Sequence, residues 1–378
     1  MLDALSYLQL QQYWWLIMSI VGSFLVFLLF VQGGQTLIDV LGKTEDEKSM
    51  VINSIGRKWE FTFTTLVLFA AGMFASFPLF YSTSFGGAYF AWKIFLICFV
   101  LQAVSFEYRR KKGNLLGQKT FEIFLYINGF LGTFLLGAVV ATFFTGSEFV
   151  RDAYNLSTWQ TNWYGIEILF NFTNVSLGLA ILFLARTLGA LYILNNVDYD
   201  IIQQRSRKQV LYNALPFLVF FLYFITKIFL MDGYAVNPQT KDVYMQSYKY
   251  FNNYLEMPVA LILFLSGVVL VLLGIGLAWF KRSIKGIWFS GIGTILTVLS
   301  IFFILGYNNT SFYPSSADIQ SSLTIENASS SRYTLVAMSY ISLFVPVVLI
   351  YIYFTWRAID RGKITKDDVN ESNDHHVY

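Results

Sequence analysis

Residues 257–280 read MPVALILFLSGVVLVLLGIGLAWF, an apolar run that contains no charged residue. About 20 such residues, coiled as a helix, cross the hydrocarbon core of a bilayer. Including this run, the chain shows the pattern in nine runs, at 13–32, 61–82, 88–106, 120–145, 166–194, 210–231, 257–280, 287–308 and 334–356. The sequence therefore predicts an all-α integral membrane protein with nine transmembrane helices, which we expect to form two four-helix bundles plus one peripheral helix.

The overall composition agrees with this class. Of the 378 residues, 56% are hydrophobic and only 13% are charged, whereas soluble domains carry about 25% charged residues. The mean hydropathy is +0.55. These values exclude a soluble globular enzyme and a disordered chain.

The basic residues predict the orientation in the membrane. Of the 26 Lys and Arg residues, 19 lie in alternate loops or after the last run, four lie in the opposite loops and three lie within runs. Cytoplasmic loops are enriched in Lys and Arg. We therefore expect a multi-pass protein of the bacterial inner membrane with a periplasmic N-terminus and a cytoplasmic C-terminus. The net charge of +3 is assigned to these loops and not to nucleic-acid binding.

Few residues could hold a metal. The two histidines, His375 and His376, stand at the end of the chain, and the single cysteine, Cys98, lies in an apolar run. This excludes a disulfide framework and an Fe–S motif, and it leaves no histidine at membrane depth to ligate a haem iron. Walker A, HExxH and GxSxG motifs are absent from the sequence. Any redox metal chemistry is therefore expected in a partner.

Two acidic residues at the predicted cytoplasmic face are candidates for proton transfer. Glu60 follows Trp59 at the start of the second run, and Glu107 ends the third run, four residues before Lys111. The two runs form a hairpin, so these ends can be close. Ionisable residues at the membrane often mark proton pathways. The alternative is that both acids simply pair with neighbouring basic residues, and the residues by themselves do not favour either interpretation.

Arg186 lies deeper, about two turns before the end of its run. A charged side chain in lipid is costly, so we expect Arg186 to be paired inside the protein. The sequence does not name its partner.

Several short motifs recur in an order that resembles one family. They are YWW at 13–15, WE at 59–60, FASFP at 74–78, FEYR at 106–109, GALY at 189–192 and GKIT at 362–365. In this order and spacing they resemble subunit II of the cytochrome bd quinol oxidases. In that family the second motif is usually Trp-Asp, the third is F-A-A-[FW]-P and the fourth is F-[DE]-[FY]-R.

The resemblance implies a function for the complex. Such oxidases oxidise quinol and reduce O₂ to water, with two b-type haems and one d-type haem in subunit I. Subunit II ligates no haem, so no catalytic residue is expected in this chain, and it contributes to proton and oxygen access. Some members hold a bound quinone, and a small single-span accessory subunit and lipid are further expected partners. Nucleic acid is not.

The resemblance also assigns residues. Glu60, Glu107 and Lys111 match the family's proton-path positions, while Trp59, Pro78 and Arg109 match motif positions with structural roles. The family often ends its first span with D-G-F-D-x-G, but here Gln32 stands in this stretch and both carboxylates are missing. Gln32 can hydrogen-bond but cannot titrate. A family arginine before the inner acid is replaced by Gln102.

The sequence predicts one membrane domain over residues 1–363 and a polar cytoplasmic tail over 364–378. The predicted function is subunit II of a bd-type terminal oxidase that supports a proton-motive force. A secondary transporter and a purely structural membrane scaffold are the alternatives. A transporter is expected to place broken helices and ionisable sites near the midplane, whereas the strongest candidates here lie at one face.

Overall fold

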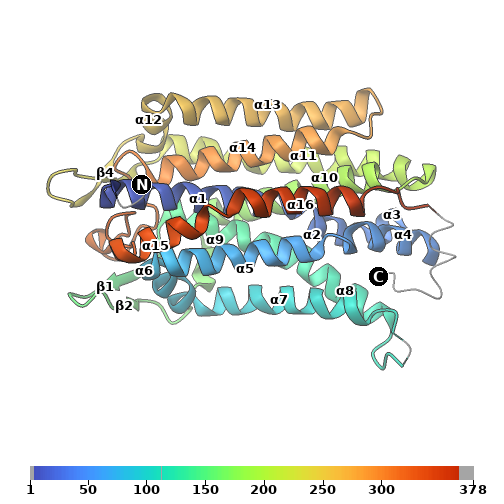
Figure 1. The fold of residues 1–378 in the computed structure, drawn as a ribbon, viewed down its shortest axis with the longest axis horizontal. Coiled ribbons are helices and arrows are strands. Elements are labelled where there is room, and N and C mark those ends of the chain that lie inside the picture. Colours follow the sequence, from blue (N-terminus) through green and yellow to red (C-terminus); the bar gives the residue numbers. More distant parts are fainter. Residues whose placement is uncertain (1–3, 112, 366–378) are drawn as a thin grey trace.

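The computed structural model describes residues 4–111 and 113–365 (Figure 1). Long helices lie roughly parallel along one axis, and short elements cap the ends. The α-helices are α1 (Tyr7–Leu28), α2 (Phe30–Gln35), α3 (Ile38–Leu41), α4 (Glu45–Gly56), α5 (Trp59–Ser76), α6 (Pro78–Phe80), α7 (Tyr89–Tyr108), α8 (Gln118–Ile127), α9 (Thr133–Thr145), α10 (Phe172–Asn196), α11 (Asp200–Leu230), α12 (Lys249–Glu256), α13 (Pro258–Phe280), α14 (Gly286–Gly306), α15 (Arg332–Ser342) and α16 (Val345–Ile359).

The remaining elements are short. Two π-helical turns, η2 (Tyr81–Gly87) and η3 (Asn128–Gly132), follow α6 and α8, and two 3₁₀ turns are η4 (Ile166–Phe170) and η5 (Ile319–Ser321). Strands β1 (Phe149–Arg151) and β2 (Ser157–Trp159) form one antiparallel pair, and β3 (Gly233–Val236) and β4 (Val243–Gln246) form a second.

Polar residues fix where several helices begin. Ser6 and Gln9 form a capping box at the start of α1, because each side chain bonds to the backbone N–H of the other residue. Asn171 accepts a hydrogen bond from the Thr173 N–H and starts α10. Such caps satisfy N–H groups that have no partner inside the helix.

The nine predicted spans are confirmed. In the part of the chain that the structure describes, eight helical segments are long and apolar enough to cross a membrane, and the pair α15–α16, bent by 40°, gives the ninth. Some predicted boundaries need correction. The predicted run 61–82 extends past the end of its spanning helix at Ser76, because Pro78 starts the separate short helix α6. The predicted run 166–194 contains the separate turn η4, and its spanning helix begins only at Phe172, because Asn171 caps it there.

The loops divide between the two ends of the bundle (Figure 1). The turns before α4, between α7 and α8, between α10 and α11, and between α13 and α14 lie at one end. We call this the basic end, because these turns and their flanks carry most of the Lys and Arg residues. Both strand pairs, α12 and α15 lie at the opposite end.

The centre of the fold is α10, which packs against α2, α9, α11 and α14. Its backbone meets that of α2 directly. A Cβ atom on Gly33 would lie 1.8 Å from the Ala185 carbonyl oxygen, and one on Gly189 would lie 2.4 Å from the Gly34 nitrogen. Glycine is therefore required where these two helices cross.

The helices fall into two groups around this centre. The first four spans lie on one side, and α10, α11, α13 and α14 lie on the other. The ninth span is the peripheral one, since α16 contains no buried residue. Large apolar side chains of α16 stay exposed on the isolated chain, for example Tyr351 at 68%, so they face lipid or a partner.

A buried ion pair anchors the end of this peripheral span. The side chain of Lys58 is fully buried, and its Nζ lies 3.0 Å from Asp360 Oδ1 and 4.6 Å from the centre of the Trp356 ring. Tyr192 and Asn196 of α10 also donate hydrogen bonds to Asp360. The residue after α16 is thus attached to both groups of helices.

Candidate functional site at the basic end

Glu60 lies in the first turn of α5 at the basic end. Its side chain is exposed, whereas the preceding Trp59 is buried. Among the residues that the structure describes, no basic side chain lies within ion-pair distance of Glu60. Its carboxylate is therefore accessible to water or to a partner chain.

Glu107 and Lys111 lie at the end of α7 and beyond it. Their charged atoms are 3.9 Å apart, and the two side chains are 49% and 54% exposed. Lys111 Nζ also lies 4.7 Å from the centre of the Tyr108 ring. Exposed pairs of this kind contribute about 0–1 kcal/mol to stability, so this pair adds little to the fold.

An aromatic stack joins the two helix ends that carry these acids. The rings of Trp59 and Phe106 are 5.9 Å apart between centroids, at an angle of 15°. Glu60 and Glu107 each follow one of these rings in sequence. The ends of the second and third spans that carry the two acids therefore lie close together at the basic end.

Arg109 is turned inward, unlike its neighbours Glu107 and Lys111. It is 2% exposed, and its Nε and Nη2 donate to Glu122 Oε1 at 3.1 Å and 2.5 Å. Glu45 Oε2 lies 3.6 Å from the same guanidinium. A charge-assisted pair of this geometry is strong and fixes α7 against α8.

Lys48 extends this network toward the surface. Its Nζ lies 2.7 Å from Asp39, 3.5 Å from Glu122 and 3.7 Å from Glu45. Although partial burial raises the pKa of Asp39, the bonds and charges of Lys48 and the hydroxyl of Tyr126 hold it below its usual value. Lys48 therefore helps to keep the Asp39 carboxylate ionised.

The network surrounds a pocket of about 340 Å³ at the basic end. We call it the mouth pocket. Its lining consists of Asp39, Glu45, Lys48, Gln118, Lys119, Glu122, Ile123 and Tyr126. The sequence analysis did not predict this pocket. The available signal was the position of Glu122 on the buried face of the amphipathic helix α8.

Gln32 is fully buried, and its Nε2 donates to Gln102 Oε1 at 3.1 Å. Both are positions at which the sequence departs from the resembled pattern. The predicted hydrogen-bonding role of Gln32 thus has a partner in the structure. Two neutral amides form a bond here without the cost of burying a charge.

Pro78 stands far from the basic end, at the start of α6. The preceding Phe77 is fully buried between Trp15 and Phe312, with ring centroids 5.8 Å and 5.7 Å away. Proline is tolerated at the first position of a helix because it lacks the N–H that would be unpaired there. Its place indicates a structural turn.

Arg186 is partnered inside the protein. Its Nε donates to Asn213 Oδ1 at 2.6 Å, its Nη1 donates to the Thr36 carbonyl at 3.4 Å, and the guanidinium lies 5.1 Å from the centre of the Phe130 ring. Within the described residues, these neutral groups take the place of an acidic partner for the guanidinium.

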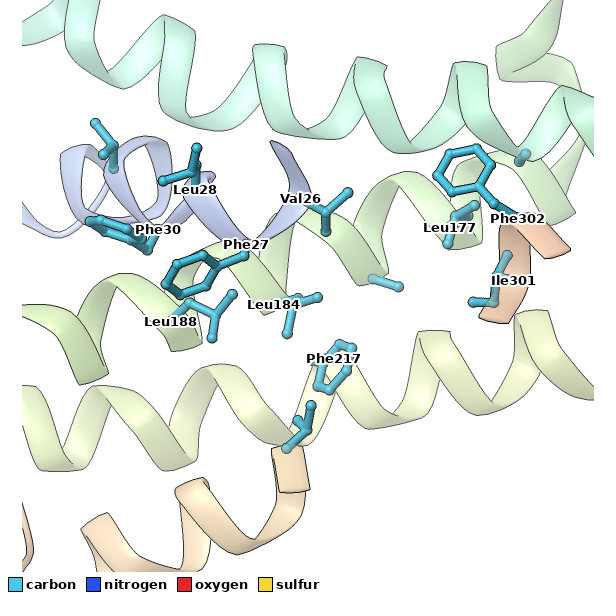
Figure 2. Close-up of a cluster of buried hydrophobic side chains, with 14 of the residues drawn as sticks. Val26, Phe27, Leu28, Phe30, Leu177, Leu184, Leu188, Phe217, Ile301 and Phe302 are labelled. Carbon is cyan, nitrogen blue, oxygen red and sulfur yellow. The ribbon is translucent and has the colours of Figure 1, made fainter. Parts of the chain in front are cut away.

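A second cavity, of about 310 Å³, lies inside the bundle and is lined by residues of α1, α5, α9, α10, α11, α13 and α14. Figure 2 shows apolar side chains around it, among them Val26, Leu184 and Phe217. Its hydroxyl-bearing residues, Thr294 and Thr297, donate to carbonyls one turn earlier.

This cavity does not fit a haem. Its lining includes no His, Met, Cys or Tyr to ligate the iron. Across residues 4–111 and 113–365, no group of three or more His, Cys, Asp or Glu side chains could hold a metal ion. The two histidines, at 375 and 376, lie outside the described residues.

Comparisons with known proteins point to one family. Residues 10–359 match the family model described as cytochrome bd terminal oxidase subunit II. The chain is 28% identical to the cytochrome bd-I ubiquinol oxidase subunit 2 of Escherichia coli K12, covering 99% of this chain and all of that one. It is 26% identical to the cytochrome bd ubiquinol oxidase subunit 2 of Bacillus subtilis, covering 84% and 86%. The fold is similar to a chain in the bd oxidase structure from Geobacillus thermodenitrificans, with a TM-score of 0.63, 14% identity and coverage of 94% and 100%.

Proposed function

Because this chain belongs to the cytochrome bd terminal oxidase subunit II family, we propose that it delivers protons from the basic end to the haem-bearing partner. The chain is a multi-pass inner-membrane subunit of a bd-type oxidoreductase that oxidises quinol and reduces O₂. Its partner is subunit I, and the complex carries haem. The location of the haems, the orientation and the proton route are our proposals.

The haems, two of b type and one of d type, are assigned to subunit I, together with the oxidation of quinol. The donor-free lining of the interior cavity supports this assignment. Replacing both histidines, His375→Ala and His376→Ala, should leave the haem bands of the purified complex unchanged. Loss of a haem band in this variant would contradict the assignment.

The basic end is assigned to the cytoplasm, with the N-terminus in the periplasm. The gathering of the Lys- and Arg-rich turns at one end supports this orientation. We further propose that residues 1–363 form the membrane domain and that 364–378 form a cytoplasmic tail. Ile364, at this boundary, is buried against Val197. Labelling of an added cysteine after residue 378 in sealed inverted vesicles tests the orientation, since only a cytoplasmic tail would react with an impermeant reagent.

Glu60, Glu107 and Lys111 are assigned to the uptake of protons. The observation that carries this proposal is that all three are exposed at the basic end, next to the Trp59–Phe106 stack. Protons taken up there and consumed by O₂ reduction, together with protons released outside by quinol oxidation, would generate a proton-motive force. Moving one charge against 100 mV costs about 2.3 kcal/mol.

Neutral variants of the complex test this assignment. Glu60→Gln and Glu107→Gln should each slow proton uptake and oxygen consumption while the haem bands stay unchanged. Glu326→Gln is the control, because Glu326 pairs with Lys241 at the opposite end. Unchanged proton uptake in both test variants would refute these residues as the route and would favour the scaffold alternative.

We propose further partners for the assembled complex, namely quinol, O₂, lipid, a bound quinone and a small single-span accessory subunit. The exposed apolar face of α16 is a surface that lipid or such a subunit could cover.

A further inference from the structure

Three helical segments direct polar side chains toward one another inside the first group of helices. Along α2 and α3, Gln32, Gln35 and Asp39 are spaced by three and four residues, which places them on one helix face. Along α7, Gln102 and Arg109 are seven residues apart and share a face in the same way. We call the strip between these segments and α8–η3 the polar seam.

Side-chain contacts tie the segments together at both ends of the seam. At its deep end, Gln32 bonds to Gln102. At the basic end, Arg109 bonds to Glu122 of α8, and Lys48 connects Glu122 with Asp39. The seam therefore runs from the mouth pocket to the Gln32–Gln102 pair.

The π-helical turn η3 forms the third wall of the seam. A Cβ atom on Gly129 would lie 2.6 Å from the Gln32 carbonyl oxygen, so glycine allows η3 to approach α2. A Cβ atom on Gly132 would lie 3.2 Å from Asn128 Nδ2 and 3.5 Å from the Phe99 ring. The Asn128 amide thus lies beside α7. Short π-helical segments often occur at functional sites.

The seam contains six side-chain amide atoms without a hydrogen-bond partner among the residues that the structure describes. They are Gln32 Oε1, Gln35 Nε2 and Oε1, Gln102 Nε2, and Asn128 Nδ2 and Oδ1. All four side chains are fully buried. Buried amides are almost always hydrogen-bonded, and ordered water with two to four bonds is the usual partner where protein groups do not suffice.

We propose that the polar seam is a hydrated proton path that begins at the mouth pocket and ends at the Gln32–Gln102 pair. This inference rests on the proposed function of proton delivery and names a route for it inside the chain. The route differs from Glu60, Glu107 and Lys111, which are exposed on the outer surface of this chain.

The transfer along the seam is a proton relay without any redox step. A proton from bulk water enters the water of the mouth pocket. Each transfer then breaks one O–H bond and forms another on the next water, so one H⁺ enters at the mouth pocket and one passes from the deep end to the haem-bearing partner. The amides of Gln35 and Asn128 hold the waters by donating and accepting bonds, and they do not titrate.

Access of a small ion tests hydration without relying on activity. In the complex with the background change Cys98→Ala, we would introduce Asn128→Cys or Gln35→Cys and add Ag⁺ from the basic-end side. Protection of the new thiol from later alkylation, read by mass spectrometry, should develop at least tenfold faster than for Ala138→Cys. Ala138 is a fully buried residue of α9 in an apolar cluster. Equal rates at the seam and control positions would overturn the proposal.

Proton uptake tests the route. Asn128→Leu and Gln35→Leu should slow proton uptake during O₂ reduction at least tenfold, while haem bands and the KM for quinol stay unchanged. Gln203→Leu is the matched control, because Gln203 is a buried amide at the basic end that bonds to the Val197 carbonyl.

The outcomes separate the two proposals. Wild-type uptake in the seam variants, together with slow uptake in Glu60→Gln and Glu107→Gln, would overturn the seam and leave the proposed function standing. Wild-type uptake in all four variants would overturn both. If a leucine variant does not assemble, the Ag⁺ measurement decides.

Discussion

The buried pair of Lys58 and Asp360 gives the sharpest prediction for stability. The side chain of Lys58 is fully buried, and Asp360 is the only acid within ion-pair distance of it among the described residues. The change Asp360→Leu therefore leaves an ammonium group in the interior without a counter-charge. It also removes the acceptor for Tyr192 and Asn196.

Removing one partner of a buried pair costs about 3–5 kcal/mol. The Asp360 side chain is 19% exposed, so water can partly replace it, and we expect the lower value of about 3 kcal/mol. Since about 1.4 kcal/mol is a factor of ten, the folding equilibrium should fall roughly a hundredfold. The contact of Lys58 with the Trp356 ring, 4.6 Å away, is already present in the wild type and therefore does not offset this loss.

The assay is the free energy of unfolding in mixed detergent micelles, followed by tryptophan fluorescence. Lys241→Met is the control, because Lys241 and Glu326 form an exposed pair at 2.8 Å that should contribute less than about 1 kcal/mol. The double variant Lys58→Met with Asp360→Leu removes both charges and should regain most of the loss. A loss of unfolding free energy in Asp360→Leu no larger than that in the control would refute this prediction. A double variant less stable than Asp360→Leu alone would refute it as well.

Two further predictions concern the helix crossing and the mouth pocket. Gly33→Ala should prevent assembly or destabilise the fold by more than about 3 kcal/mol, because its Cβ would lie 1.8 Å from the Ala185 carbonyl oxygen. The control Gly86→Ala meets nothing within 4 Å and should assemble normally. The yield of haem-bearing complex measures both variants, and equal yields would contradict the close crossing of α2 and α10. Because Lys48 helps hold the pKa of Asp39 below its usual value of 3.8, the carboxylate stabilises the fold above its unfolded pKa and loses this effect as the pH falls through the lower folded value. The Tm difference between wild type and Asp39→Asn should therefore shrink below about pH 4, and a difference that grows there would show the opposite sign.

The candidate site contains residues that the sequence identifies and contacts that it does not. Residue types and the end-of-span position identified Glu60, Glu107 and Lys111 as candidates, and the structure places them on the surface. The inward turn of Arg109, two residues after Glu107, depends on the partner that α8 offers, Glu122. Periodicity indicates which residues share a helix face, but it does not say which helix that face meets.

Arg186 illustrates the same limit. The cost of a charge in lipid predicted that it would be partnered, and the structure supplies Asn213, Thr36 and Phe130. One contact comes from the next helix and two come from the first and fourth spans. No local pattern links these positions.

The sequence by itself determined the membrane class, the number of spans and which loops carry the basic residues. These properties depend on the length of each apolar run and on the charge of each loop, which are local quantities set by the bilayer. Only the tertiary structure decided that Gln32 meets Gln102, that Lys58 is held by Asp360, and that a mouth pocket and a polar seam exist. Those features arise from contacts between helices far apart in the chain, because close packing at glycines such as Gly33 and Gly129 fixes which faces meet.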